Sequence, residues 1–166
     1  MYFKVISFLE EKELTLGLNI RLFTENDRTT GFVIYEKDDV PCFVDVEYGN
    51  KLAFISLAKN SFVKKEDEHF TRTNKIYIEK IINIEDWEMW NDPIFCLEAA
   101  KRAWQALRFI KNQTIDMVYF ALIQDGEEVE DQKLCPSEEI YVLASVKASF
   151  YKQPNKAASK SVCQCL

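Results

Sequence analysis

The chain has 166 residues but contains only one histidine and four glycines. His69 alone cannot form a multi-histidine metal site, and it lies in a charged run rather than beside an apolar segment. The glycines form neither a GxGxxG nor a GxxxxGK pattern, so the sequence disfavours nucleotide-dependent enzymes. Any nucleophilic cysteine would have to use His69 as its base. We therefore expect a protein that is not an enzyme and that binds no metal and no cofactor.

Long apolar runs are also missing. The longest, residues 117–123, has seven residues, whereas a membrane-spanning helix needs about 20. The N-terminal residues lack the basic region and cleavage site of a signal peptide. The five cysteines are odd in number and include no CxxC pair, which fits a reducing compartment better than a disulfide framework. We expect a cytoplasmic protein without a membrane span.

Acidic residues outnumber basic residues by 27 to 21, which gives a net charge of −6. The excess lies before residue 151, because the segment 151–166 contains three lysines and no acidic residue. Nucleic-acid binding requires Lys and Arg gathered on one face, so an acidic body disfavours it. The charge favours a basic protein partner instead.

The first half of the chain is rich in β-branched and aromatic residues, as β-strands are. Residues 14–23 show the clearest alternation, with leucines and an isoleucine on one face. By this pattern the predicted strands are residues 2–9, 14–23, 31–35, 42–46, 52–57 and 75–84.

Residues 92–112 predict one long amphipathic helix. Asp92 is a natural N-cap, and Pro93 occupies the first helical position, where its missing N–H costs nothing. Apolar residues then recur on one arc and polar residues on the opposite arc. We expect this helix to pack on a mostly antiparallel sheet of about 6–8 strands, which is an α+β fold.

The C-terminal half is less regular. Residues 115–123 are almost continuously apolar, which is typical of a central strand. Residues 140–151 alternate and predict another strand, although Pro136 and the acidic residues after it could begin a helix instead. An acidic loop is predicted between them. We see no internal repeat, and we predict one globular domain over residues 1–152 with a disordered polar and basic tail over 153–166.

Two acidic segments are the candidate partner-binding surfaces. The first interleaves acids with tryptophans, which are common interface anchors, and consists of Glu85, Asp86, Trp87, Glu88 and Trp90. The alternative is that both tryptophans only fasten the start of the helix to the sheet. The second is the acidic loop, with Asp125, Glu127, Glu128, Glu130 and Asp131, for which a solvated surface loop is the alternative.

Together these features favour a non-catalytic protein-binding domain. A small acidic domain with acidic and aromatic clusters has the character of a stoichiometric inhibitor, such as a bacterial immunity protein that occludes the active site of a basic, nuclease-like toxin. The oligomeric state stays open. One alternative is a small-molecule-binding domain or enzyme with a pocket between helix and sheet. Another is a membrane-targeted effector that uses the Cys-Gln-Cys-Leu sequence at residues 163–166 as a lipid-attachment box.

Overall fold

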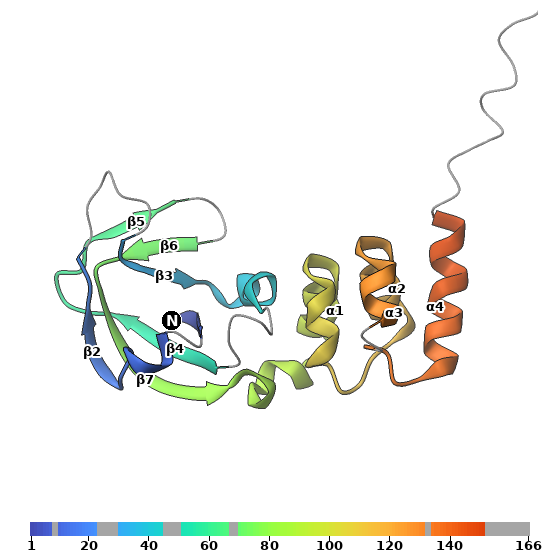
Figure 1. The fold of residues 1–166 in the computed structure, drawn as a ribbon, viewed down its shortest axis with the longest axis horizontal. Coiled ribbons are helices and arrows are strands. Elements are labelled where there is room, and N and C mark those ends of the chain that lie inside the picture. The colour runs from blue at the N-terminus through green and yellow to red at the C-terminus, as the bar shows by residue number, and fades with distance from the viewer. Residues whose placement is uncertain (8–9, 23–29, 45–50, 67–69, 132–133, 152–166) are drawn as a thin grey trace, which may run out of the picture.

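The computed structural model describes residues 1–7, 10–22, 30–44, 51–66, 70–131 and 134–151, without the side chain of Asp131. Strands occupy the first half of the chain and helices the second (Figure 1). The strands are β1 (Tyr2–Ile6), β2 (Gly17–Ile20), β3 (Phe32–Tyr35), β4 (Lys51–Leu57), β5 (Val63–Lys65), β6 (Phe70–Thr73) and β7 (Lys75–Asn83). Two short 3₁₀ helices lie among them, η1 (Glu10–Lys12) and η2 (Lys37–Phe43).

All seven strands form one antiparallel sheet in the order β2-β7-β4-β1-β3-β6-β5. The central strand β1 pairs with β4 from Tyr2 opposite Ile55 to Ile6 opposite Lys51. Strands β2 and β5 form the two edges. The predicted α+β fold with a mostly antiparallel sheet is confirmed.

The helices form a row that extends from one end of the sheet (Figure 1). In this row α1, α2 and α4 lie side by side, with α1 nearest to the sheet and α4 farthest from it. The bounds are η3 (Ile84–Asp86), η4 (Glu88–Asn91), α1 (Pro93–Arg102), η5 (Trp104–Arg108), α2 (Ile115–Gln124), α3 (Gly126–Asp131) and α4 (Glu138–Tyr151). Within the described residues, no helix is both long and apolar enough to cross a bilayer.

The single helix predicted over residues 92–112 is shorter than expected. Its start is as predicted, since the Asp92 side chain accepts hydrogen bonds from two backbone N–H groups of the first turn. The helix ends at Arg102, because Ala103 is extended, with φ −149° and ψ 119°, and the chain then continues as η5. Residues of η5 such as Leu107 are buried in the same core. The helical spacing of apolar residues therefore continues past Ala103, so this spacing does not show where the helix ends.

Both strands predicted in the C-terminal half are helices. Residues 115–123 lie in α2, residues 140–151 lie in α4, and the predicted acidic loop contains α3. Thr114 and Ser137 cap α2 and α4 by accepting hydrogen bonds from backbone N–H groups of the first turn. The continuous apolar run fits a helix here because α2 is covered by α1 on one side and by α4 on the other. The predicted tail over 153–166 lies outside the described residues.

Three details of the β half also differ from expectation. Strands β5 and β6 were not predicted. The strand predicted over 42–46 begins in η2, where Cys42 is exposed, and residues 45–46 lie outside the described part. In β2 the predicted alternation is present, but its apolar face points to solvent. Asn19 faces inward, where its amide donates to the carbonyls of Thr15 and Gly17 at 2.7 and 3.0 Å. The exposed apolar residues of this segment are Leu16, Leu18, Ile20 and Leu22.

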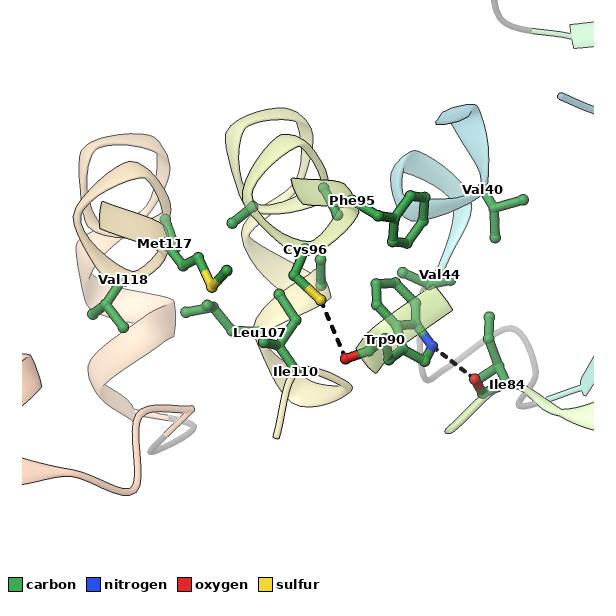
Figure 2. Packing of buried hydrophobic residues seen from close by; sticks show 14 of the residues in the cluster. Val40, Val44, Ile84, Trp90, Phe95, Cys96, Leu107, Ile110, Met117 and Val118 are labelled. Atoms are coloured by element: carbon green, nitrogen blue, oxygen red, sulfur yellow. Dashed lines mark hydrogen bonds between the residues drawn. The ribbon is translucent and has the colours of Figure 1, made fainter. Parts of the chain in front are cut away.

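Two clusters of buried side chains hold the molecule together. One lies on one face of the sheet and contains residues of β1, β3, β4 and β7, such as Ile55. The other joins the opposite face to the helical row. Figure 2 shows this second cluster running from Val40 of η2 through Trp90 to Val118 of α2. The row of helices is thus anchored to the sheet by a continuous apolar core.

Candidate functional site

The two tryptophans of the first acidic segment are core residues. Trp87 and Trp90 are 2% and 3% exposed. The indole N–H of Trp90 donates to the carbonyl of Ile84 at 2.8 Å, and the Cys96 thiol donates to the carbonyl of Trp90 at 3.2 Å (Figure 2). Both indoles pack on Phe95, with ring centroids 5.2 and 5.4 Å away. They fasten the start of α1 to the sheet, which is the alternative that the sequence left open, and their rings do not reach the surface.

The three acids of the same segment do reach the surface. Glu85, Asp86 and Glu88 are exposed on η3 and η4. The side-chain amide of Asn83 donates to Asp86 at 3.2 Å. These carboxylates therefore lie on the surface of the segment that joins the sheet to α1, whose interior contains the packed aromatic rings.

The helices α1, α2 and α4 begin in the same way, and we call each helix with the residues that follow it a unit. Each follows a capping residue, Asp92, Thr114 or Ser137, whose side chain accepts a hydrogen bond from the third residue after it. The backbone carbonyl of each cap also accepts from the fourth residue after it, at 2.9, 3.1 and 3.0 Å. The three caps lie 22 and 23 residues apart in the sequence.

The units share their interior as well as their caps. The seventh residue after each cap is an alanine, Ala99, Ala121 or Ala144, and each of the three is buried. In the first two units its carbonyl accepts from the eleventh residue, at 2.9 and 3.0 Å, and the helix ends there. A short helix follows, η5 or α3, and the fifteenth residue of each unit, Leu107 or Val129, anchors it in the core. The helical part is therefore a short stack of similar units.

Glutamine side chains link neighbouring units. The amide of Gln113 donates to the carbonyls of Leu107 and Leu134, at 2.9 and 2.7 Å. The amide of Gln124, at the end of α2, donates to the carbonyl of Ala100 in α1 at 2.7 Å. Both contacts join the first unit to the second, in addition to apolar packing.

The second unit is the acidic one. Its short helix α3 buries Val129 and exposes three glutamate carboxylates to solvent. We call these exposed residues the acidic ridge: Glu127, Glu128 and Glu130. Asp125 has a structural contact, because its carboxylate accepts the N–H of Glu128 at 3.2 Å and so caps the helix. Asp131 ends α3, and its side chain lies outside the described residues.

Tyr141 of α4 lies beside the acidic ridge, since it lines the same cavity as Glu130. Burial together with the charge of Glu130 raises the pKa of this tyrosine. Residues 126–131 of the predicted acidic loop thus form a short helix that packs on α2. The two predicted acidic groups lie apart in the fold, since η3 and η4 precede α1 whereas α3 follows α2 (Figure 1).

Cavities lie beside two of the short helices, α3 and η2. One of about 680 Å³ lies between α3 and α4 and is lined by Val129, Glu130, Cys135, Pro136, Glu138 and Tyr141. The other, of about 420 Å³, lies between β1, β3 and η2 and is lined by Lys4, Val5, Ser7, Glu10, Val33, Tyr35, Cys42 and Phe43. The second cavity contains two charged groups whose pKa values are shifted, Lys4 and Glu10.

Those groups are a buried lysine and its acidic partner. The ammonium of Lys4 lies 3.0 Å from Glu10, whose carboxylate also receives Arg21 at 3.1 Å and the N–H and hydroxyl of Ser7 at 3.3 and 3.2 Å. Burial lowers the pKa of Lys4. Burial alone would raise the pKa of Glu10, but the charge of Lys4 and these hydrogen bonds lower it. Burial also raises the pKa of Tyr35 to about 12. Because Glu10 is saturated with donors, this pair serves the fold first.

The described residues contain no group of three or more His, Cys, Asp and Glu side chains that could hold a metal ion. Of the cysteines described, Cys96 is buried, and burial raises the pKa of its thiol to about 11. Burial also raises the pKa of Cys42 and of Cys135. These thiols are protonated at neutral pH, which is the reverse of what a nucleophilic cysteine requires.

No family model, no curated protein and no solved structure matches this chain.

Proposed function

We propose that this protein is a non-catalytic protein-binding domain that recognises a basic partner through the acidic ridge of α3. The observation that carries the proposal is that the acidic ridge lies on a helix anchored in the core. Its carboxylates stand on a helix that the buried side chain of Val129 anchors in the core. A fixed group of like charges can complement a basic surface at a lower entropic cost than a mobile loop would incur.

The partner class follows from charge. Exposed carboxylates of one sign raise the association rate of a positively charged protein and repel acidic ones. A nuclease-like toxin fits this description because it needs a basic active site to hold a phosphate substrate. Occlusion of that active site is therefore the mode of action that we propose, with the protein acting as a stoichiometric inhibitor of immunity-protein type. The exposed carboxylates of η3 and η4 form a second, separate acidic surface for the same partner.

A matched pair of charge variants tests the proposal. The ridge variant carries Glu127→Gln, Glu128→Gln and Glu130→Gln. The control removes the same three charges from exposed positions elsewhere, through Glu36→Gln, Asp38→Asn and Glu79→Gln. The full chain and both variants are immobilised and exposed to an extract of the source organism at low salt, and bound proteins are identified by mass spectrometry.

The expected result is a basic protein that the wild type and the control capture and that the ridge variant loses. If the ridge variant captures the same proteins in the same amounts as the control, the proposal is wrong. For a captured nuclease, titration of its activity should reach full inhibition at a one-to-one ratio. Binding without inhibition would contradict the occlusion mode alone.

The alternative of a small-molecule site is best located at the 420 Å³ cavity beside Lys4 and Tyr35. A buried lysine and a buried tyrosine hydroxyl could orient a polar ligand there. We rank it second because Glu10 already uses the charge of Lys4. The third alternative, a lipid-attachment box at residues 163–166, falls outside the described residues and stays a prediction from the sequence.

A further inference from the structure

The sheet opens between two of its neighbouring strands, β1 and β3. Among the described residues, β1 pairs with β4 along its whole length, but it pairs with β3 at Phe3 and Tyr35 alone. The cavity of about 420 Å³ lies where these two strands separate. Lys4 and Val5 both line it, although neighbouring residues of a strand point to opposite faces of a sheet. The cavity is therefore a gap within the sheet rather than a hollow on one face.

Hydrogen-bond donors gather at this gap without enough acceptors. The ammonium of Lys4 has three N–H groups, and among the described residues Glu10, at 3.0 Å, is the one acceptor that it meets. The Tyr35 side chain is largely buried, and within the described chain its hydroxyl forms no hydrogen bond. Arg72, on the neighbouring strand β6, has a buried Nε that lies 3.7 Å from Glu66, too far for a hydrogen bond. These donors need a further acceptor.

The excess of donors indicates the chemistry of a ligand. Buried donors without acceptors are costly, so the missing group is one that brings acceptor oxygens. Glu10 cannot supply them, because other donors already occupy its carboxylate. Lys4 and Arg72 are cations, and anionic oxygens accept stronger hydrogen bonds from cations than neutral ones do. Val33 and Phe43 add apolar surface to the lining of the cavity. A carboxylate joined to a small apolar body matches both parts.

We propose that this cavity binds a small organic acid, whose carboxylate accepts hydrogen bonds from Lys4 and Tyr35 and whose apolar body packs on Phe43. The volume of about 420 Å³ is within the range of small-molecule sites. An anion beside Lys4 also offsets part of the cost of burying its charge. The site is separate from the acidic ridge, which lies on α3, and the proposal does not depend on the partner of that ridge.

Two pairs of probe compounds test the proposal in two-dimensional NMR titrations of the full chain. Hexanoate and phenylacetate carry the carboxylate, whereas hexanamide and phenylacetamide have the same bodies without the charge. Both acids should give saturable shifts in β1, β3 and η2, with dissociation constants of about 1–10 mM for ligands of this size. Both amides should bind at least about tenfold more weakly, because they lose the charge-assisted hydrogen bonds.

Variants locate the site. Tyr35→Phe keeps the ring but removes the hydroxyl, and it should weaken the binding of both acids by about fivefold. Lys4→Met should abolish the preference for acid over amide. Tyr77→Phe is the matched control, since it removes the same hydroxyl from an exposed position on β7 and should leave binding unchanged.

Several results would overturn the proposal. One is that neither acid gives saturable shifts below about 50 mM. Others are shifts that fall outside the lining of the cavity, amides that bind as tightly as the acids, or a folded Lys4→Met variant that keeps the preference for the acids. Acid binding by Tyr35→Phe at the strength of the wild type also contradicts it, and this comparison stands even if Lys4→Met does not fold.

Discussion

Ala99 and Ala121 occupy equivalent positions in successive helical units. Each is the seventh residue after its cap, each is buried, and each accepts through its carbonyl the N–H of the residue that ends its helix, Ala103 or Asp125. Ala144 holds the same position in α4. A side chain limited to one methyl group allows neighbouring helices to approach closely at this point.

Enlarging these alanines should therefore destabilise the fold. Ala99→Leu, Ala121→Leu and Ala144→Leu each place three extra carbons in a filled contact, which should lower the free energy of unfolding by about 1–3 kcal/mol. The measurement is urea unfolding followed by circular dichroism. Glu98→Leu, on the exposed side of α1 next to Ala99, is the control and should change the unfolding free energy by less than about 0.5 kcal/mol. Equal effects of Ala99→Leu and Glu98→Leu would show that the alanines are not contact positions.

Five of the seven strands were predictable because their signal is local, whereas β5 and β6 were not predicted. Alternation in 75–84 and β-branched residues in 2–6 marked β7 and β1 with little error. Burial was less predictable, since it depends on which face of the sheet the rest of the chain covers. In β2 the inward position went to Asn19, which satisfies its amide on neighbouring carbonyls, and the leucines face outward.

The helical units were harder to predict for a physical reason. A helix covered on two sides, such as α2, has apolar residues almost all round and loses the period that distinguishes it from a buried strand. The local signals were the caps Thr114 and Ser137. The alanines at equivalent positions lie 22 and 23 residues apart, and so few matching residues per unit are too little for a sequence comparison to detect.

The sequence identified the acidic residues of the candidate site, but it did not show which of the predicted residues reach the surface. The acids of the ridge were identified, whereas Trp87 and Trp90 gave the same signal for an interface anchor as for a core residue. Only the packing of both indoles against Phe95 distinguishes the two roles. Asp125 was likewise indistinguishable from its neighbours until its cap contact with Glu128 was seen.

Removing a cap should weaken the unit that follows it. Thr114→Ala deletes the acceptor of the Met117 N–H and should lower the free energy of unfolding by about 1 kcal/mol. Thr114→Ser keeps the hydroxyl and should retain most of the stability. Thermal unfolding of the two variants side by side provides the comparison. If alanine and serine behave alike, the hydroxyl contributes nothing to the start of α2.

The buried ion pair should respond unequally to loss of its two partners. Glu10→Gln leaves the ammonium of Lys4 buried without a counter-ion and should cost about 3 kcal/mol of unfolding free energy. Lys4→Met leaves Glu10 with Arg21 and Ser7 and should cost less. Chemical denaturation of both variants at neutral pH measures the order of the two effects. The reverse order would contradict the proposed role of Glu10.

The same pair predicts a pH dependence. The folded-state pKa of Glu10 lies below its ordinary value of 4.5, so its stabilising contribution is complete above that pH and is lost as the pH falls through the folded value. The stability difference between the wild type and Glu10→Gln should therefore be largest near neutral pH and should shrink below pH 4.5. Denaturation curves across the acid range measure it. A difference that stays constant down to the acid limit would mean that Glu10 is not the titrating group.

The central claim is that the acidic ridge guides a basic protein to this surface. It is tested most directly by the association rate constant of a captured partner, measured by surface binding at several salt concentrations. For the wild type the rate should fall steeply with salt, and for the Glu127→Gln, Glu128→Gln, Glu130→Gln variant it should be slower at low salt and less dependent on salt. The control variant at Glu36, Asp38 and Glu79 should follow the wild type. If the ridge and control variants have the same salt dependence, the ridge is not the recognition surface.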